Sequence, residues 1–188
     1  MTTNETKSAV LGSWVSIAPE VRPSAIKKPD GSLKPFYLTR HFTLRSDDSF
    51  TLEIVNSGDP YGRIPLVQMR LSGHVEWKGD HPVAAGAQMV DFTAGTQYEV
   101  TPLHPAFVEI LNATAREGFN HWAVGQSQDI LAKAFPPFGL IKDELFKEYD
   151  LIYVTGGMLF WGARHVDGRG FDTEANRPTN LQIPLIRP

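Results

Sequence analysis

An unbroken alternation of apolar and polar side chains runs along residues 36–45. Side chains of a strand point alternately to its two faces, so this stretch is predicted to be a strand whose apolar face includes Arg40. The other members of that face are Phe36, Leu38, Phe42 and Leu44. A guanidinium keeps its charge, so an arginine in an apolar row needs an anionic partner. That partner is either a protein carboxylate or a ligand, and the pattern leaves both open.

Further strands are predicted before and after this one, joined by short turns. They cover residues 9–17, 50–55, 64–77, 88–93 and 97–101. Residues 148–162 are predicted to form a β-hairpin, because Gly156-Gly157 provides the two-residue turn in which both residues need positive φ. Strands joined to their neighbours in this way are typical of an antiparallel meander.

One segment has a helical period instead. Apolar residues recur at spacings of three and four between His104 and Glu117, and Pro105 suits the first position of a helix. Residues 119–147 show no dominant period, and a lid over the sheet is one interpretation of them. The predicted class is therefore mainly β, an antiparallel barrel or half-barrel with one or two helices.

The predicted organisation is a single domain over residues 1–188. Residues 1–8 are polar and are expected to lack regular structure. The rest divides into a β-meander at 9–103, a helix with a connecting segment at 104–147, and a C-terminal hairpin with a tail at 148–188.

Composition narrows the classes of partner. Hydrophobic residues make up 41% of the 188 residues and charged residues 21%, which is ordinary for a globular domain. A net charge of −3 without a cluster of lysine and arginine argues against nucleic acid and against an anionic membrane surface. A small or apolar ligand is the better expectation.

The chain contains no cysteine, which excludes disulfides, thiolate metal ligands and thiol nucleophiles. No apolar run approaches the ~20 residues that a membrane-spanning helix needs. The first residues also lack the pattern of a signal peptide. We therefore predict a cytoplasmic protein with no membrane span. A homodimer through an exposed edge strand is left open.

The motifs of common nucleotide-binding and hydrolytic enzymes are missing, namely G-x-x-x-x-G-K-[ST], a helix-opening G-x-G-x-x-G, G-x-S-x-G and H-E-x-x-H. The six histidines are far apart and include no i,i+4 pair. We therefore predict no metal site and no cofactor.

Arginines in rigid or apolar contexts are the main candidates for binding a ligand. Arg22 and Arg177 each precede a proline, and Arg40 lies in the apolar row described above. Arginines that converge on one cavity recognise carboxylates through paired hydrogen bonds. Glu20 and Asp167 are the carboxylates that could neutralise them instead.

Gly12-Ser13-Trp14 matches the G-x-W found at the start of lipocalin-like barrels. In such barrels the tryptophan plugs the closed end and often packs on an arginine, which combines apolar burial with a cation–π contact. The alternative is an ordinary core tryptophan on an opening strand.

Short blocks follow one another in order along nearly the whole chain: Trp14-Val15-Ser16, Glu20-Val21-Arg22-Pro23, Phe36-Tyr37-Leu38-Thr39-Arg40, Glu148-Tyr149-Asp150-Leu151, Leu159-Phe160, His165-Val166-Asp167, Arg177-Pro178-Thr179 and Gln182-Ile183-Pro184-Leu185. This ordered set resembles the domain of the adenomatosis polyposis coli down-regulated protein family. The resemblance implies a lipocalin-like (calycin) antiparallel barrel or half-barrel with an apolar pocket for a lipid-like ligand.

The chain departs from that family's animal members in several ways. Those proteins are secreted, cysteine-containing tandem domains with a membrane anchor, and they inhibit Wnt signalling. Here there is a single cysteine-free domain, and Pro19 stands where they have a cysteine. The resemblance therefore implies the pocket and does not imply Wnt inhibition.

The expected function is the binding of a small hydrophobic or amphipathic molecule, acidic or neutral, inside the barrel. Arg22, Arg40 and Arg177 are expected at the polar end of the pocket, with Trp14 at or under it.

Two other classes of function compete with this one. The first is a cofactor-free cyclase or isomerase of a hydrophobic biosynthetic intermediate, in which Glu20, His41 or His165 moves a proton. The second is a ligand-free interaction module, whose barrel would be filled with side chains.

Overall fold

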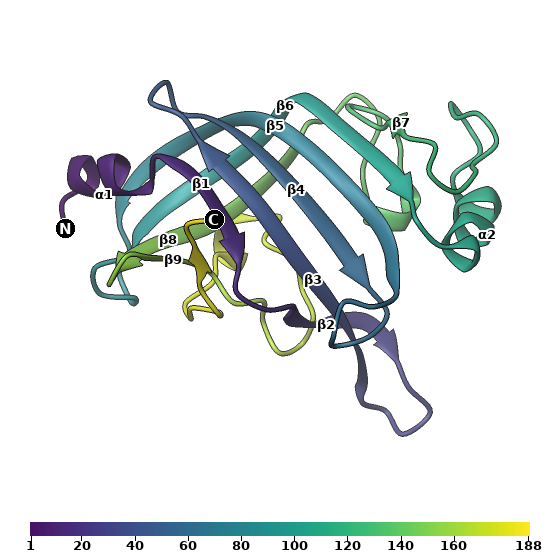
Figure 1. The fold of residues 1–188 in the computed structure, drawn as a ribbon, viewed down its shortest axis with the longest axis horizontal. Helices are drawn as coiled ribbons and strands as arrows, with labels where there is room; N and C mark the ends of the chain where they lie inside the picture. Colours follow the sequence, from purple (N-terminus) through teal and green to yellow (C-terminus); the bar gives the residue numbers. More distant parts are fainter.

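Ten antiparallel strands form one sheet in the computed structural model, which describes residues 1–24 and 26–188 (Figure 1). The strands are β1 (Gly12–Ser16), β2 (Glu20–Lys27), β3 (Leu33–Leu44), β4 (Ser49–Ser57), β5 (Pro65–Asp80), β6 (Gln88–Pro102), β7 (Gln128–Asp129), β8 (Phe146–Thr155), β9 (Met158–Trp161) and β10 (Leu185–Ile186). The helices are α1 (Thr3–Val10) and α2 (Pro105–Thr114), with 3₁₀ turns η1 (Pro136–Phe138) and η2 (Glu174–Asn176).

The sheet closes on itself through its shortest strands. β1 pairs with β3 on one side and with β10 on the other, and β10 continues to β9. The ring runs β1-β10-β9-β8-β6-β5-β4-β3 and returns to β1, while β2 extends it beside β3. The predicted mainly β class, with an antiparallel sheet and two helices, is confirmed. Closure removes the free edges along this ring and leaves an interior face for apolar side chains.

Two local predictions are confirmed in detail. Helix α2 begins where expected: the His104 side chain accepts a hydrogen bond from the Ala106 N–H, and Pro105 occupies the first turn. The hairpin between β8 and β9 turns at Gly156 and Gly157, whose φ angles are 56° and 74°. Both angles are in the region that a type I′ turn requires and that glycine adopts freely.

The expected break between residues 93 and 97 is wrong, because β6 continues through it as one strand. The register with β5 shifts at this point, because residues 94–96 of β6 bulge opposite the single residue Gly73 of β5. A Cβ on Gly73 would lie 1.8 Å from the Thr93 carbonyl oxygen, so only glycine allows this approach.

The expectation that residues 1–8 lack regular structure is also wrong. Helix α1 opens with a capping box in which Thr2 and Glu5 bond each other's backbone N–H groups. Lys7 then forms an ion pair with Asp48 at 2.8 Å. Val10 is fully buried at the other end of the helix. These contacts with the barrel stabilise a helix that is too short to be stable alone.

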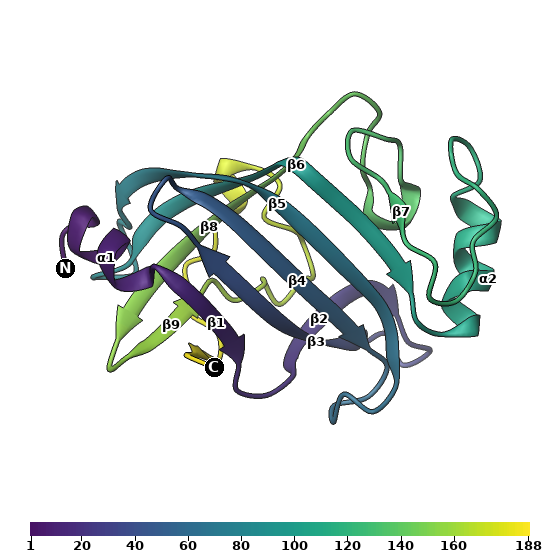
Figure 2. The same cartoon turned by 45° about the horizontal axis from the view of Figure 1, so that its top comes forward.

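Helix α1 lies at one end of the barrel, opposite the end where α2 lies (Figures 1 and 2). The Trp14 side chain is 1% exposed, and its indole N–H donates to the Val10 carbonyl oxygen at 2.7 Å. The Arg187 guanidinium lies 3.8 Å from the centre of the Trp14 ring. It also donates to the carbonyl oxygens of Ala9 and Leu11, at the end of the helix. The arginine contact implied by the G-x-W motif is therefore present.

Replacing Arg187 with methionine is expected to lower the free energy of unfolding by ~1–2 kcal/mol, because the ring contact and the bonds to the helix end are lost together. Urea denaturation followed by tryptophan fluorescence measures the change. Arg63, which stacks on the exposed Tyr61, is the matched control, and its replacement should change stability by less than ~0.5 kcal/mol. Equal effects of the two substitutions would contradict a stabilising role for Arg187 at this end.

Aromatic side chains fill the part of the interior next to this end. The Trp161 ring stacks on Phe92 at 4.7 Å and meets Phe42 edge-on at 4.9 Å. Phe50 in turn packs on both phenylalanines. Such contacts add to the stability that burial of the rings provides.

The C-terminal tail contacts both β2 and β8. The Tyr149 N–H in β8 donates to the Phe171 carbonyl oxygen at 2.7 Å. A Cβ on Gly168 would lie 3.1 Å from the carbonyl oxygen of Ser24 in β2. The tail is thus in close contact with both strands and covers the side chains that they turn inward.

Candidate functional site

A carboxylate between two arginines lies inside the barrel, where β2 extends beside β3. Glu20 Oε2 lies 3.1 Å from Arg40 Nη2, and Arg22 Nε donates to Glu20 Oε1. All three residues are buried, with 5–6% of their surface exposed. The pairing of Glu20 with Leu38 across the two strands aligns the inward side chains of β2 with that of Arg40. The position of Arg40 in an apolar row required an anionic partner, and the carboxylate of Glu20 is one.

Aromatic rings provide the other contacts of these guanidiniums. Arg40 lies 4.7 Å from the centre of the Trp161 ring, and Arg22 lies 5.5 Å from that of Phe171. A buried guanidinium is stabilised by the face of an aromatic ring because the ring quadrupole is negative there. The ion cluster therefore sits directly on the aromatic part of the interior.

Asp150, on β8, is a second buried carboxyl group on the inner face. Its side chain is fully buried, and its Oδ1 accepts hydrogen bonds from the N–H groups of Leu151 and Gly162. Burial raises the pKa of Asp150 to about 7, and the negative charge of Glu148 acts in the same direction, against the charge of Arg40. This carboxyl group therefore changes its protonation state near neutral pH.

Three atoms of this region have no hydrogen-bond partner within the described part of the chain. They are Arg40 Nε, Trp161 Nε1 and Asp150 Oδ2, and each is shielded from solvent. Buried polar atoms are nearly always paired in folded proteins, since an unpaired one costs about 1–3 kcal/mol. Asn56 Oδ1, on the neighbouring strand β4, is in the same condition. We call Glu20, Arg22, Arg40, Asp150 and Trp161 the inner polar cluster.

The inner polar cluster offers two kinds of hydrogen bond. The N–H groups of Arg40 and Trp161 can donate to an oxygen, and Asp150 Oδ2 can accept or donate according to its protonation. Each of these atoms can bond to an oxygen-bearing group.

Arg177 does not join this cluster. Its guanidinium donates to Asp91 Oδ1 at 2.7 Å and to the carbonyl oxygens of Val90 and Asp150. Side chains of β6 alternate between the two faces, and Phe92 points inward. The neighbouring Asp91, paired with Arg177, therefore lies on the outer face of the sheet. Lys147 also approaches Asp91, at 3.2 Å.

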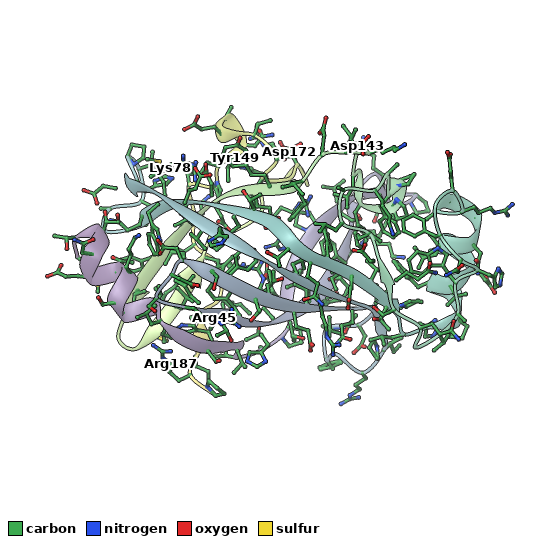
Figure 3. All side chains as sticks on the ribbon, turned by 90° about the horizontal axis from the view of Figure 1, so that it is seen from above. Arg45, Lys78, Asp143, Tyr149, Asp172 and Arg187 are labelled. Carbon is green, nitrogen blue, oxygen red and sulfur yellow. The ribbon has the colours of Figure 1, made fainter. Side chains whose placement is uncertain are left out.

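Asp91, Arg177 and Lys147 form an outer ion cluster. Burial opposes ionisation of Asp91, but Arg177 and Lys147 hold its pKa below the usual range. Lys78 adds a contact at 3.6 Å, and Figure 3 shows it on the same side of the molecule as Tyr149, which packs on the Arg177 guanidinium. The charge of Arg177 is therefore paired with Asp91, outside the inner polar cluster.

The histidine candidates also lie outside the inner polar cluster. His41 is exposed and, being next to Arg40 along β3, points to the opposite face. It borders a shallow hollow on the outer surface, together with Glu53 and Arg70. His165 is in the tail, where its Nε2 lies 3.1 Å from the Asn176 carbonyl oxygen. Trp14 is at the end where α1 lies, with its N–H already bonded.

Asp150 and Trp161 are site residues that the sequence reasoning did not single out. A signal was available for Asp150, because alternation along β8 puts it on the same face as Ile152. Its lack of a full set of partners depends on the closed sheet and could not be read from the pattern.

Within residues 1–24 and 26–188, no three His, Asp or Glu side chains lie close enough together to hold a metal ion. No helix in that part of the chain is both long and apolar enough to span a membrane. A scan of the sequence against protein-family models and a search of curated proteins found no match.

Proposed function

We propose that this protein is a lipocalin-like barrel, related to the adenomatosis polyposis coli down-regulated domain, that binds a small amphipathic molecule at the inner polar cluster. One observation carries the proposal: Arg40, Trp161 and Asp150 present buried hydrogen-bonding atoms that no group of residues 1–24 and 26–188 satisfies. A bound polar head group would remove this deficit. The polar atoms of an ordinary protein core already have hydrogen-bond partners, so they need no ligand.

Apolar residues next to the cluster support an amphipathic ligand over a purely polar one. Leu38 precedes Arg40 on the same face of β3, and Ile54 pairs with Arg40 from β4. Leu38 is 4% exposed. Aromatic rings pack toward Trp14 and also beside α2, where Trp122 contacts Phe119 and Phe135. The apolar part of the ligand would therefore lie against Leu38 and Ile54.

A cofactor-free cyclase or isomerase is the second candidate, and Asp150 is the observation that favours it. A carboxyl group with a pKa of about 7 and a free oxygen can donate or accept a proton at neutral pH. In this case Asp150 would move the proton, in place of Glu20, His41 or His165. Arg40 and Trp161 would then stabilise negative charge that develops on the substrate.

The aromatic packing around Trp161 is the feature that favours a ligand-free interaction module. That packing accounts for one part of the interior and leaves the unpaired atoms of the cluster unexplained. Native mass spectrometry of the purified protein separates the first two classes from the third. A co-purified small molecule supports a binding protein or an enzyme, and a bare protein under mild conditions supports the module.

Replacing Arg40 with methionine is expected to leave the protein folded and to remove the co-purified molecule. Folding should survive because Glu20 keeps Arg22 as its partner. Loss of a charge-assisted bond with the ligand's anion still buried weakens binding by ~2–5 kcal/mol. Arg70, which pairs with Glu53 on the outer surface, is the matched control. Retention of the molecule by the Arg40→Met variant, or its loss from Arg70→Met, would contradict the proposed site.

A further inference from the structure

The balance of charge inside the barrel depends on one proton. Four ionisable side chains of the inner polar cluster are more than nine-tenths buried, two of them guanidiniums and two of them carboxyl groups. With Asp150 ionised, the charges of Arg22 and Arg40 are balanced by those of Glu20 and Asp150. With Asp150 protonated, one positive charge is uncompensated. An uncompensated buried charge is costly, so a bound anion would be favoured in that state.

The unpaired atoms suit the same partner. Arg40 Nε and Trp161 Nε1 are donors, and a protonated Asp150 Oδ2 is a third donor. Three donors within one buried cluster match an oxygen anion, which only accepts. An ionised Asp150 would instead repel such a group.

We propose that the ligand is an amphiphile with a single oxyanion head group, and that it binds together with a proton on Asp150. The inference rests on the proposed binding function and specifies the ligand's charge and its dependence on pH. The head group accepts hydrogen bonds from Arg40, Trp161 and the protonated carboxyl group of Asp150.

Other charged groups near Asp150 do not change this balance. Glu148 and Arg164 are half-buried and carry opposite charges. Asp172 is exposed beside Arg164. Arg177 reaches only the backbone carbonyl oxygen of Asp150 and is neutralised by Asp91 on the outer face. The pKa of Asp150, about 7, places the change between states in the neutral range.

A pair of fluorescent probes tests the inference. 1-Anilinonaphthalene-8-sulfonate carries one negative charge at every pH between 6 and 8.5, and N-phenyl-1-naphthylamine has the same rings without the sulfonate. Any change in the affinity of the sulfonate probe between pH 6 and pH 8.5 therefore reflects a change in the charge of the protein. Fluorescence titration of the whole protein at both pH values gives the dissociation constants, and circular dichroism confirms that the fold is retained.

The anionic probe is expected to bind about 30-fold more weakly at pH 8.5 than at pH 6, because only ~3% of Asp150 is protonated at the higher pH. The neutral probe should bind equally at both. Asp150→Asn, which cannot ionise, should bind the anionic probe at both pH values as the natural protein does at pH 6. Glu148→Gln is the matched control: it should shift the midpoint of the pH dependence to lower pH without abolishing it.

Distinct results separate failure of this inference from failure of the proposed function. Equal affinity of the natural protein for the anionic probe at both pH values would overturn the inference, as would a pH dependence that persists in Asp150→Asn. Binding of the neutral probe alone would leave an apolar binding function and remove the anionic head group. Binding of neither probe at either pH would remove the proposed function itself. If Asp150→Asn does not fold, the natural protein and Glu148→Gln still decide the matter.

Discussion

Replacing Glu20 with glutamine is expected to destabilise the protein by ~3–5 kcal/mol, the cost of leaving buried charges without their counter-ion. Glu20 is the carboxylate that contacts both Arg22 and Arg40. A glutamine is the same size, but its NH₂ group would face a guanidinium donor. Two buried positive charges would then repel each other. Urea denaturation at pH 8, followed by circular dichroism, measures the loss.

Glu53→Gln is the control for this substitution. Glu53 pairs with Arg70 at 3.0 Å, but both side chains are well exposed, so the loss should stay below ~1 kcal/mol. Arg40→Met should also be milder than Glu20→Gln, because it leaves Glu20 paired with Arg22. Similar losses for Glu20→Gln and Glu53→Gln would mean that the inner polar cluster is open to solvent, and would contradict the buried ion cluster.

Replacing Gly73 with alanine is expected to cost ~3 kcal/mol or more, at or above the top of the usual range for overpacking. The new Cβ would lie 1.8 Å from the Thr93 carbonyl oxygen and 2.9 Å from the Gly95 nitrogen. Both contacts are with backbone atoms, which cannot turn away as a flexible side chain does. β5 and β6 would have to separate at the bulge. Thermal and urea denaturation measure the effect.

Gly95→Ala is the matched control, because Gly95 belongs to the same bulge. A Cβ there would meet only Leu145 Cδ1, at 3.7 Å, which is an ordinary contact. Its effect on stability should be within ~1 kcal/mol, since loss of glycine's flexibility in the unfolded chain offsets small strain. A Gly73→Ala variant as stable as Gly95→Ala would show that β5 and β6 do not approach each other this closely.

Several features were determined by the sequence alone because their causes are local. The φ angles of Gly156 and Gly157 follow from the turn that a two-residue hairpin needs. Helix α2 follows from Pro105 and the spacing of apolar residues. The alternation around Arg40 also placed its charge on the inner face. Each of these depends on the geometry of neighbouring residues, which a single sequence displays directly.

Other features were decided only by the tertiary structure. Helix α1 depends on the burial of Val10 and on Arg187, a residue far away along the chain. The ring closes through β10, which has two residues and no pattern of its own. Such short elements are stable only through their contacts with the rest of the folded chain.

The composition of the candidate site shows the same division. Alternation placed Arg40 inside, but the register of β2 on β3 decided that Glu20 would be its partner. Arg177 resembled Arg22 in its local sequence, yet Asp91 holds it on the outer face. Asp150 became a candidate only because the closed sheet removes it from water, which raises the pKa of its carboxyl group and leaves one oxygen unpaired. Burial and charge pairing join residues distant in sequence, so they are properties of the folded molecule.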